Sequence, residues 1–113
     1  MPVLNDAVQV DTTFAASAPS GATEGFNTGD RWGMGSPMLL QLAVDGGTSV
    51  TVTVHQYLPD AGVWVAVASG VVVSTGTATY LRAAPNTRMF VQPTASAGGP
   101  TALYTMTLPG SMT

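Results

Sequence analysis

Apolar and polar residues alternate along much of the chain with the two-residue period of a β-strand. The clearest case lies in residues 49–58, where Val50, Val52 and Val54 alternate with polar residues. One side of such a strand packs on a core, and the other side faces mixed surroundings. No window of useful length has the 3.6-residue period of a helix. The pattern therefore predicts an all-β chain.

Other segments with this pattern bring the expected number of strands to about eight. Glycine, proline, asparagine and aspartate at their ends are typical of turns. Eight short antiparallel strands predict a single β-sandwich, either a jelly roll or an immunoglobulin-like fold, and the strand count favours the jelly roll. The expected strands cover residues 7–13, 38–44, 49–58, 63–68, 71–74, 77–83, 88–92 and 101–108.

Three stretches of the sequence lack the strand pattern, and one of them, residues 93–100, is expected to be a short connection rich in Ser, Ala and Gly. Residues 1–6 form the N-terminal tail of a single domain that we expect to span residues 1–113. Residues 14–37 are rich in Ala, Ser, Gly and Thr. A loop of this length inside a domain is uncommon and usually has a function. We therefore expect an extended loop or arm at residues 14–37.

The register of one hairpin follows from its turn. If residues 59–62 close the hairpin, Tyr57 lies opposite Trp64 and His55 lies opposite Ala66. Opposed residues point to the same face of a sheet, so these four side chains all point away from the core. An outward Tyr–Trp pair is typical of an interface anchor. The same pair would also stabilise its own hairpin or lie beneath the arm, and the sequence leaves these interpretations open.

The same register predicts which residues of this hairpin face the core. Val54 is expected opposite Val67, and Leu58 opposite Val63, with all four side chains directed inward.

A second hairpin is expected from residues 77–83 and 88–92, with residues 84–87 as its turn. In that register Leu81 lies opposite Phe90, and both faces of the hairpin are partly apolar.

The composition changes the picture from a free domain to a part of an assembly. Of the 113 residues, 45% are hydrophobic and only 8% are charged, and the chain has neither Lys nor Cys. Soluble domains carry about 25% charged residues. Much of this surface must therefore consist of Thr, Ser, Gly and exposed apolar side chains, and such a surface associates readily.

Charge and hydropathy exclude several classes of partner. The net charge of −3 and the pI near 4.5 argue against direct nucleic-acid binding, which needs clustered Lys and Arg. No run of about 18 apolar residues is present, so no membrane span is expected. The first six residues lack the basic start and apolar run of a signal peptide.

No constellation of residues predicts catalysis, a cofactor or a metal site. His55 is the only histidine, and no Gly-x-Ser-x-Gly elbow accompanies it. Zinc sites need several His or Cys ligands. Paired carboxylates for glycoside cleavage are hard to place, because the single glutamate, Glu24, lies in the expected arm and Asp11 is the only acid within an expected strand. The acidic residues are scattered, so only a calcium site built from loop acids remains open. We expect that the chain is not an enzyme.

The glycine-rich segment 29–35 contains Arg31 and Trp32. Arg and Trp are the residue types that most often dominate binding energy at interfaces. Alternatively, Trp32 packs on the domain's own core and holds the arm down, and both interpretations stay open. The candidate interface residues are Arg31, Trp32, His55, Tyr57 and Trp64.

Three short segments carry a resemblance to a known class of proteins. They are Thr-Val-Thr-Val-His-Gln-Tyr at 51–57, Gly-Val-Trp at 62–64 and Tyr-Leu-Arg at 80–82. In a short, Cys-free β chain they resemble the small capsid decoration, or cement, proteins of tailed bacteriophages. The resemblance implies a structural protein that binds the outside of the capsid lattice and stabilises it. Its partners would be the major capsid protein and further copies of the chain, as a homodimer or homotrimer, on a virion assembled in the host cytoplasm.

Two other functions are compatible with the same residues. A carbohydrate-binding sandwich would stack sugars on exposed Trp32, Tyr57 and Trp64, and it predicts a flat row of exposed aromatic rings. A component of a phage tail or neck would use the same kinds of contact as a decoration protein and would differ only in its location.

Overall fold

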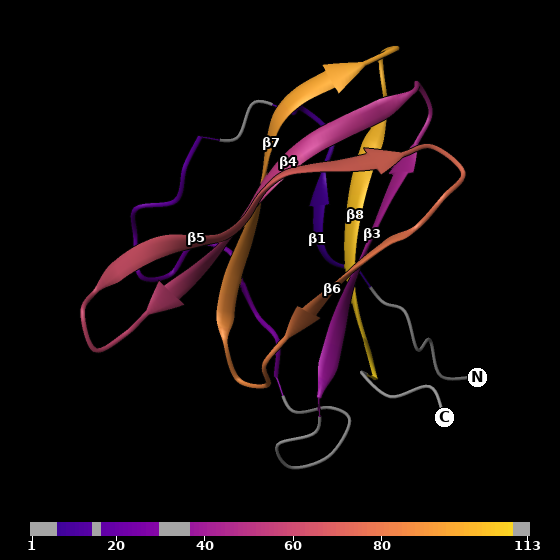
Figure 1. Ribbon diagram of the computed structural model, residues 1–113. Coiled ribbons are helices and arrows are strands. Elements are labelled where there is room, and N and C mark those ends of the chain that lie inside the picture. The colour runs from indigo at the N-terminus through magenta and orange to yellow at the C-terminus, as the bar shows by residue number, and fades with distance from the viewer. Residues whose placement is uncertain (1–6, 15–16, 30–36, 110–113) are drawn as a thin grey trace.

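Two antiparallel four-stranded β-sheets pack face to face (Figure 1). The computed structural model describes residues 7–14, 17–29 and 37–109, which include no helix. The strands are β1 (Ala7–Asp11), β2 (Phe26–Asn27), β3 (Met38–Asp45), β4 (Ser49–Leu58), β5 (Val63–Ser74), β6 (Thr79–Ala83), β7 (Arg88–Ala97) and β8 (Ala102–Pro109). The predicted all-β antiparallel sandwich of eight strands is confirmed.

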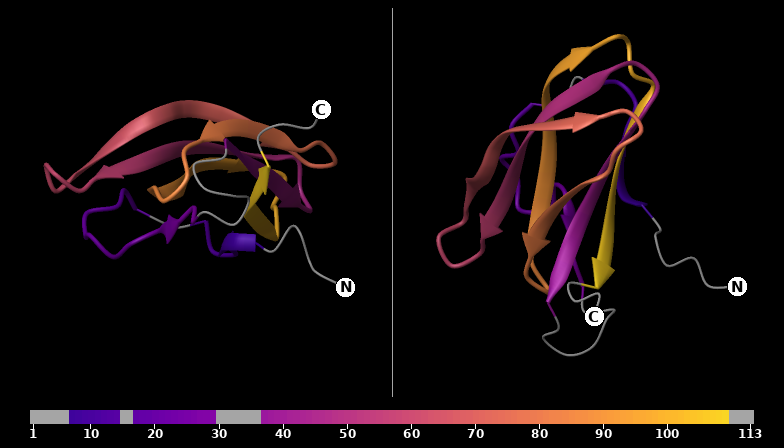
Figure 2. Two further views of the ribbon diagram at one scale, coloured as in Figure 1. Left: turned by 90° about the horizontal axis from the view of Figure 1, so that it is seen from below. Right: turned by 45° about the vertical axis from the view of Figure 1, so that its right-hand side comes forward.

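The strand pairings are nested along the chain. One sheet has the order β1-β8-β3-β6 and the other β2-β7-β4-β5, so the first strand pairs with the last, the second with the seventh, the third with the sixth and the fourth with the fifth. Only the connection between β4 and β5 stays within one sheet. All the other connections cross from one sheet to the other, as the two views of Figure 2 allow the reader to follow.

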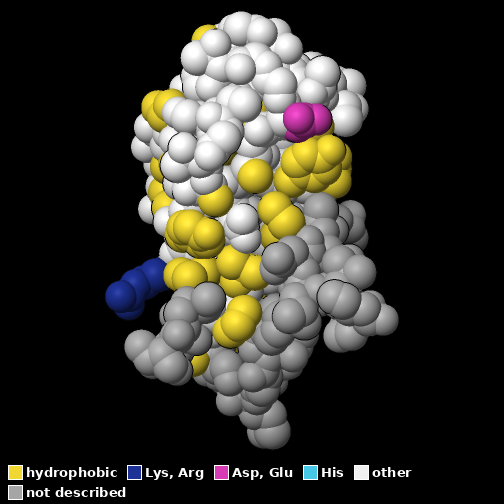
Figure 3. Space-filling view, turned by 90° about the vertical axis from the view of Figure 1, so that its right-hand side faces the viewer, with side chains coloured by type: hydrophobic (Ala, Val, Ile, Leu, Met, Phe, Trp, Pro, Cys, Tyr) yellow, Lys and Arg dark blue, Asp and Glu magenta, His cyan; other side chains and the backbone are white. Residues whose placement is uncertain are grey.

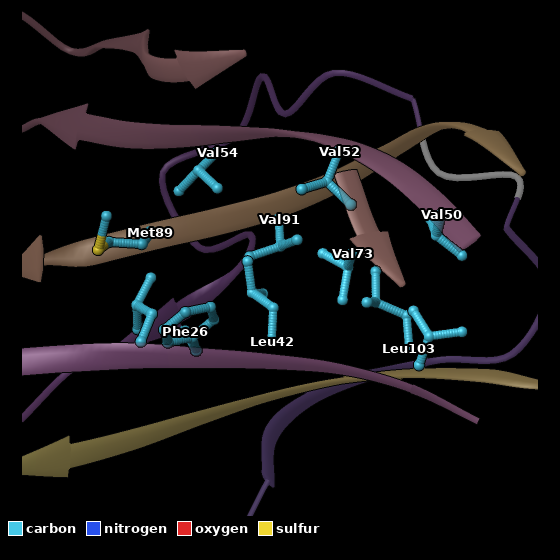
Figure 4. Close-up of a cluster of buried hydrophobic side chains, with 11 residues drawn as sticks. Phe26, Leu42, Val50, Val52, Val54, Val73, Met89, Val91 and Leu103 are labelled. Atoms are coloured by element: carbon cyan, nitrogen blue, oxygen red, sulfur yellow. The ribbon is translucent and has the colours of Figure 1, made fainter. Parts of the chain in front are cut away.

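The core lies between the two sheets and is built from alternating residues of the central strands. Val50, Val52 and Val54 of β4 are at most 1% exposed and point toward the facing sheet, where Leu42 of β3 and Leu103 of β8 meet them (Figure 4). Fully burying a valine or leucine side chain contributes about 1.5–3 kcal/mol. This core therefore fixes the inner face of β4 as the sequence pattern predicts.

Strand β5 is continuous, and the expected division into strands at 63–68 and 71–74 is wrong. Ser69 and Gly70 form an irregularity inside the strand and not a turn between two strands. The pairing shifts twice along β5, so that Val54 lies opposite Ala68 and not opposite Val67 as expected. The cause is that β5 has more residues than the length of β4 it pairs with, and β-bulges accommodate the extra residues.

Strands β6 and β7 do not form the predicted hairpin. They belong to different sheets, because the connection at residues 84–87 crosses between the layers. Buried Thr28 holds this connection: its hydroxyl donates to the carbonyl oxygen of Ala84 at 2.7 Å and accepts from the backbone N–H of Thr87 at 3.0 Å. Phe90 therefore pairs across to β4, and its expected partner Leu81 lies in the other sheet.

The segment expected to be a free arm is partly built into the sandwich. Residues 26–27 form β2, which pairs with β7, and Phe26 is only 8% exposed. Gly25, with φ of +76°, permits this approach: a Cβ atom there would lie 2.2 Å from the carbonyl oxygen of Met89. Residues 15–16 and 30–36 of the expected arm, and the expected tail at 1–6, lie outside the described residues.

Candidate protein-interaction surface

The hairpin of β4 and β5 extends beyond the edge of the sandwich. Residues 49–54 and 68–74 cover the core, and residues 55–67, here called the distal half, project past the facing sheet (Figures 1 and 2). Asp60 is the only Asp, Glu, Lys or Arg in the distal half.

One face of the distal half carries large apolar side chains that nothing in the described residues covers fully. Leu58, Val63, Val65 and Val67 are 36%, 46%, 37% and 50% exposed. The prediction that the inward face of the hairpin is buried along its whole length is therefore wrong beyond Val54. The reason is that the described strands of the facing sheet end before they reach the distal half (Figure 2). We call these four residues the apolar row.

The other face of the hairpin carries an aromatic cluster. The predicted register holds here, because Tyr57 pairs with Trp64 and His55 with Ala66. The ring centroids of Tyr57 and Trp64 are 5.2 Å apart with the planes tilted by 55°, and Phe90 of β7 lies 6.5 Å from both Trp64 and His55. Sequence reasoning missed Phe90, because it assigned this residue to a different hairpin.

The segment before β2 packs on this aromatic cluster. The indole Nε1–H of Trp64 donates a hydrogen bond to the carbonyl oxygen of Gly21 at 3.1 Å, and the Trp64 side chain is half-buried. Among the interpretations left open by the sequence, the structure therefore places the Tyr57–Trp64 pair beside the arm. A tryptophan held by its N–H in this way is fixed in orientation.

A carboxylate and a guanidinium hold that segment in place. Glu24 accepts hydrogen bonds from the backbone N–H groups of Gly21 and Ser20, and these bonds lower the pKa of Glu24 below its ordinary value of 4.5. Arg88 of β7 donates to the carbonyl oxygens of Glu24 at 3.0 Å and Thr23 at 3.4 Å. The segment is thus tied to β7 by charge-assisted hydrogen bonds.

His55 is held by a hydrogen bond to a side chain of the neighbouring strand. Its Nε2 donates to Oε1 of Gln92 on the neighbouring strand at 2.8 Å. In the part of the chain that the structure describes, no three His, Cys, Asp or Glu side chains gather closely enough to hold a metal ion. Across the same residues, no helix is long and apolar enough to cross a membrane.

A hollow of about 320 Å³ lies beside the last residues of β4 in the distal half. Gln56 and Leu58 line it from the hairpin, and Asn27 and Arg88 line it from β2 and β7. The hollow therefore adjoins the Leu58 end of the apolar row.

The structure brings together three of the five residues predicted for the interface, namely His55, Tyr57 and Trp64. Arg31 and Trp32 lie outside the described residues. The apolar row was not predicted as a surface, because the sequence does not reveal where the facing sheet ends. No protein-family model, curated protein or solved structure matches the chain.

Proposed function

We propose that the chain is a structural protein of a virus particle, a decoration protein that binds the outside of a phage capsid and stabilises the shell. The observation that carries the proposal is the apolar row on an almost uncharged hairpin that projects from the sandwich. Contiguous apolar patches on a protein surface are typical of interaction sites. The partner in this proposal is the major capsid protein, and the protein performs no reaction.

The chemistry of the row suits a permanent contact. The four side chains are aliphatic, and full burial of each would contribute about 1.5–3 kcal/mol relative to water. Asp60 is the only charged residue within the distal half, so the hairpin itself has little charge to desolvate when a partner covers the row. Interfaces of permanent assemblies are apolar in the same way.

We infer further that the sandwich is a jelly roll. The nested pairing of first with last, second with seventh, third with sixth and fourth with fifth supports this over an immunoglobulin-like fold, in which at least half of the connections between consecutive strands stay within one sheet. Jelly rolls occur in viral capsid proteins and also in lectins. The fold alone therefore does not decide the function.

The aromatic cluster argues against the carbohydrate-binding alternative. A sugar-stacking surface needs a flat, exposed row of rings. Here the rings of Tyr57 and Trp64 are tilted by 55°, those of Trp64 and Phe90 by 70°, and the indole N–H is bonded to the arm. A tail or neck protein would use the apolar row equally well, so its distinction from a decoration protein depends on location.

A binding assay with phage capsids that lack the protein tests this proposal. The variant with Val63→Thr, Val65→Thr and Val67→Thr keeps the shape of the side chains and removes the apolar surface. We expect the purified wild-type protein to co-sediment with the capsids and the triple variant to lose at least about tenfold in affinity.

Val72→Thr is the matched control, because Val72 is 55% exposed on the same strand but lies over the sandwich. This control should bind like the wild type. Equal binding of the triple variant and the wild type, or no binding of the wild type to any capsid, would contradict the proposal.

A further inference from the structure

Strand β8 has its polar and apolar side chains on the unexpected faces. Thr105 and Thr107 point into the core and are 1% and 0% exposed. Tyr104, Met106 and Leu108 alternate with them and therefore point outward, away from the core. An antiparallel sheet with one solvated face places its polar residues on that face. The inverted pattern indicates that the outward face of β8 is also covered.

The neighbouring strands extend this apolar face across the whole sheet. Tyr80 of β6 pairs with Gln41, and Val10 of β1 pairs with Tyr104, so both point outward. Their side chains are 53% and 51% exposed. Figure 3 shows this side of the molecule, where hydrophobic side chains form a band between a basic side chain at one margin and an acidic one near the opposite margin. The outward positions, here called the outer face, are Val10, Leu39, Gln41, Ala43, Asp45, Tyr80, Arg82, Tyr104, Met106 and Leu108.

The two charges on the outer face lie at its opposite ends. Arg82 pairs with Leu39 near the start of β3, and Asp45 is the last residue of that strand. The positions of Arg82 and Asp45 along β3 are therefore six residues apart, a distance of about 20 Å. Both side chains are exposed. The outer face is therefore positive at one end, negative at the other and apolar between them.

We propose that the outer face binds the outer face of a second copy of this chain across a two-fold axis. A two-fold axis that lies between the sheets and perpendicular to the strands makes the strands of the copies antiparallel. Arg82 of each copy then meets Asp45 of the other. This charge complementarity selects a second copy, because a face with opposite charges at its two ends complements itself only in that orientation.

The middle of the outer face fits this arrangement. Along β3, Gln41 and Ala43 lie midway between the position opposite Arg82 and Asp45. The small side chain of Ala43 allows close approach of the sheets, and the amides of Gln41 in the two copies can each donate to and accept from the other.

The size of the face suits a specific dimer. Strand spacings of about 4.8 Å and a rise of about 3.3 Å per residue give the four strands, with their 5, 8, 8 and 5 residues, a projected area of about 400 Å². Two copies would then bury at least about 800 Å² of projected area, and the relief of the side chains adds to this value, so the contact has the size of a weak, reversible dimer. The dimer leaves the distal half of β4–β5 free, so this inference does not depend on the capsid proposal.

Sedimentation equilibrium of the full chain tests the proposal. We expect a monomer–dimer equilibrium, and Met106→Glu should raise the dissociation constant by at least about 100-fold, because it places a carboxylate in the centre of the apolar contact. Gln41→Glu adds a charge without changing the volume, so it should weaken the dimer even if Met106→Glu impairs folding. Val72→Glu on β5 is the control and should leave the dimer intact.

A charge exchange tests the orientation of the two copies. Arg82→Glu or Asp45→Arg alone should weaken the dimer about tenfold, and the two together should restore it. A wild-type chain that stays monomeric, a trimer, or a dimer indifferent to both Met106→Glu and Gln41→Glu would overturn the proposal. So would a monomer that binds capsids and loses this binding on Met106→Glu, because the shell would then be the occupant of the face.

Discussion

The two halves of the β4–β5 hairpin contain the same kind of residue in opposite environments. Val50, Val52 and Val54 in the half over the core are at most 1% exposed, whereas Val63 and Val65 in the distal half are 46% and 37% exposed. The strands are continuous and paired through both halves. The difference arises because the facing sheet covers only one of them. Burial of a valine in a strand thus depends on what lies opposite it, and the apolar row is exposed because it continues past the core.

A carboxylate introduced into each half of the hairpin should give the largest difference in the free energy of unfolding. Val52→Asp puts an unpaired charge into the core and should cost about 5 kcal/mol, enough to unfold a marginally stable domain. Val65→Asp in the distal half should change the free energy of unfolding by less than about 1 kcal/mol. Urea denaturation followed by circular dichroism measures both. Similar losses of stability for the two variants would mean that the distal half also packs on a core.

Alanine substitutions at two glycines should give a smaller difference in the free energy of unfolding. Gly25 and Gly70 both have positive φ, but a Cβ at Gly25 would lie 2.2 Å from the Met89 carbonyl oxygen, and a Cβ at Gly70 would meet nothing within 4 Å. Gly25→Ala should therefore cost about 2 kcal/mol or more, and Gly70→Ala only the backbone strain of about 1 kcal/mol. Equal costs in thermal or urea unfolding would show that β2 is not held closely against β7.

A smaller change should loosen the arm without disturbing the hairpin. Trp64→Phe keeps an aromatic ring but removes the N–H that donates to Gly21, at a cost of about 1 kcal/mol. Tyr57→Phe is the control, since it removes a hydroxyl and leaves the ring pair intact. Hydrogen exchange of residues 20–25 should accelerate in the first variant only. Acceleration in both, or in neither, would contradict the role assigned to the indole N–H.

Acidification should have the smallest effect on stability, and this effect should be confined to the arm. Hydrogen bonds from Gly21 and Ser20 lower the pKa of Glu24, so its ionised form stabilises the folded arm above the ordinary pKa of 4.5. This contribution is lost as the pH falls through the lowered pKa. In a Trp32→Phe background, the emission of Trp64 should shift to the red over that range. The same variant with Glu24→Gln should lack this transition, and an unchanged transition would assign it to another group.

Much of the fold could be predicted from periodicity because alternation reports which strands pack on one side of a core. The Tyr57–Trp64 register followed from a four-residue turn, which is local information. The predicted pairing of Val54 with Val67 was wrong, because β5 has more residues than the length of β4 that it pairs with, and the turn does not reveal where the bulges that accommodate them lie. β2 has only two residues, too few for any periodicity, and its position depends on Gly25 and β7.

The candidate site was harder to predict than the fold. The sequence identified His55, Tyr57 and Trp64 as members of one face, but the cluster also contains Phe90. Phe90 lies on β7, which pairs with β4 because the connection before it crosses from one sheet to the other. The outward direction of Tyr104 and Met106 could not be chosen from β8 alone, because threonine and apolar residues alternate there and either set fits a core. Exposure of the apolar row depends on where the opposite sheet ends, which no local pattern records.

Cryo-electron microscopy of virions that carry the protein tests the central claim most directly. We expect a sandwich of this shape on the outer surface of the capsid, with residues 58–67 of the β4–β5 hairpin in contact with the major capsid protein and the apolar row buried. A position in the tail or neck, or a capsid-bound sandwich whose apolar row faces solvent, would contradict the account.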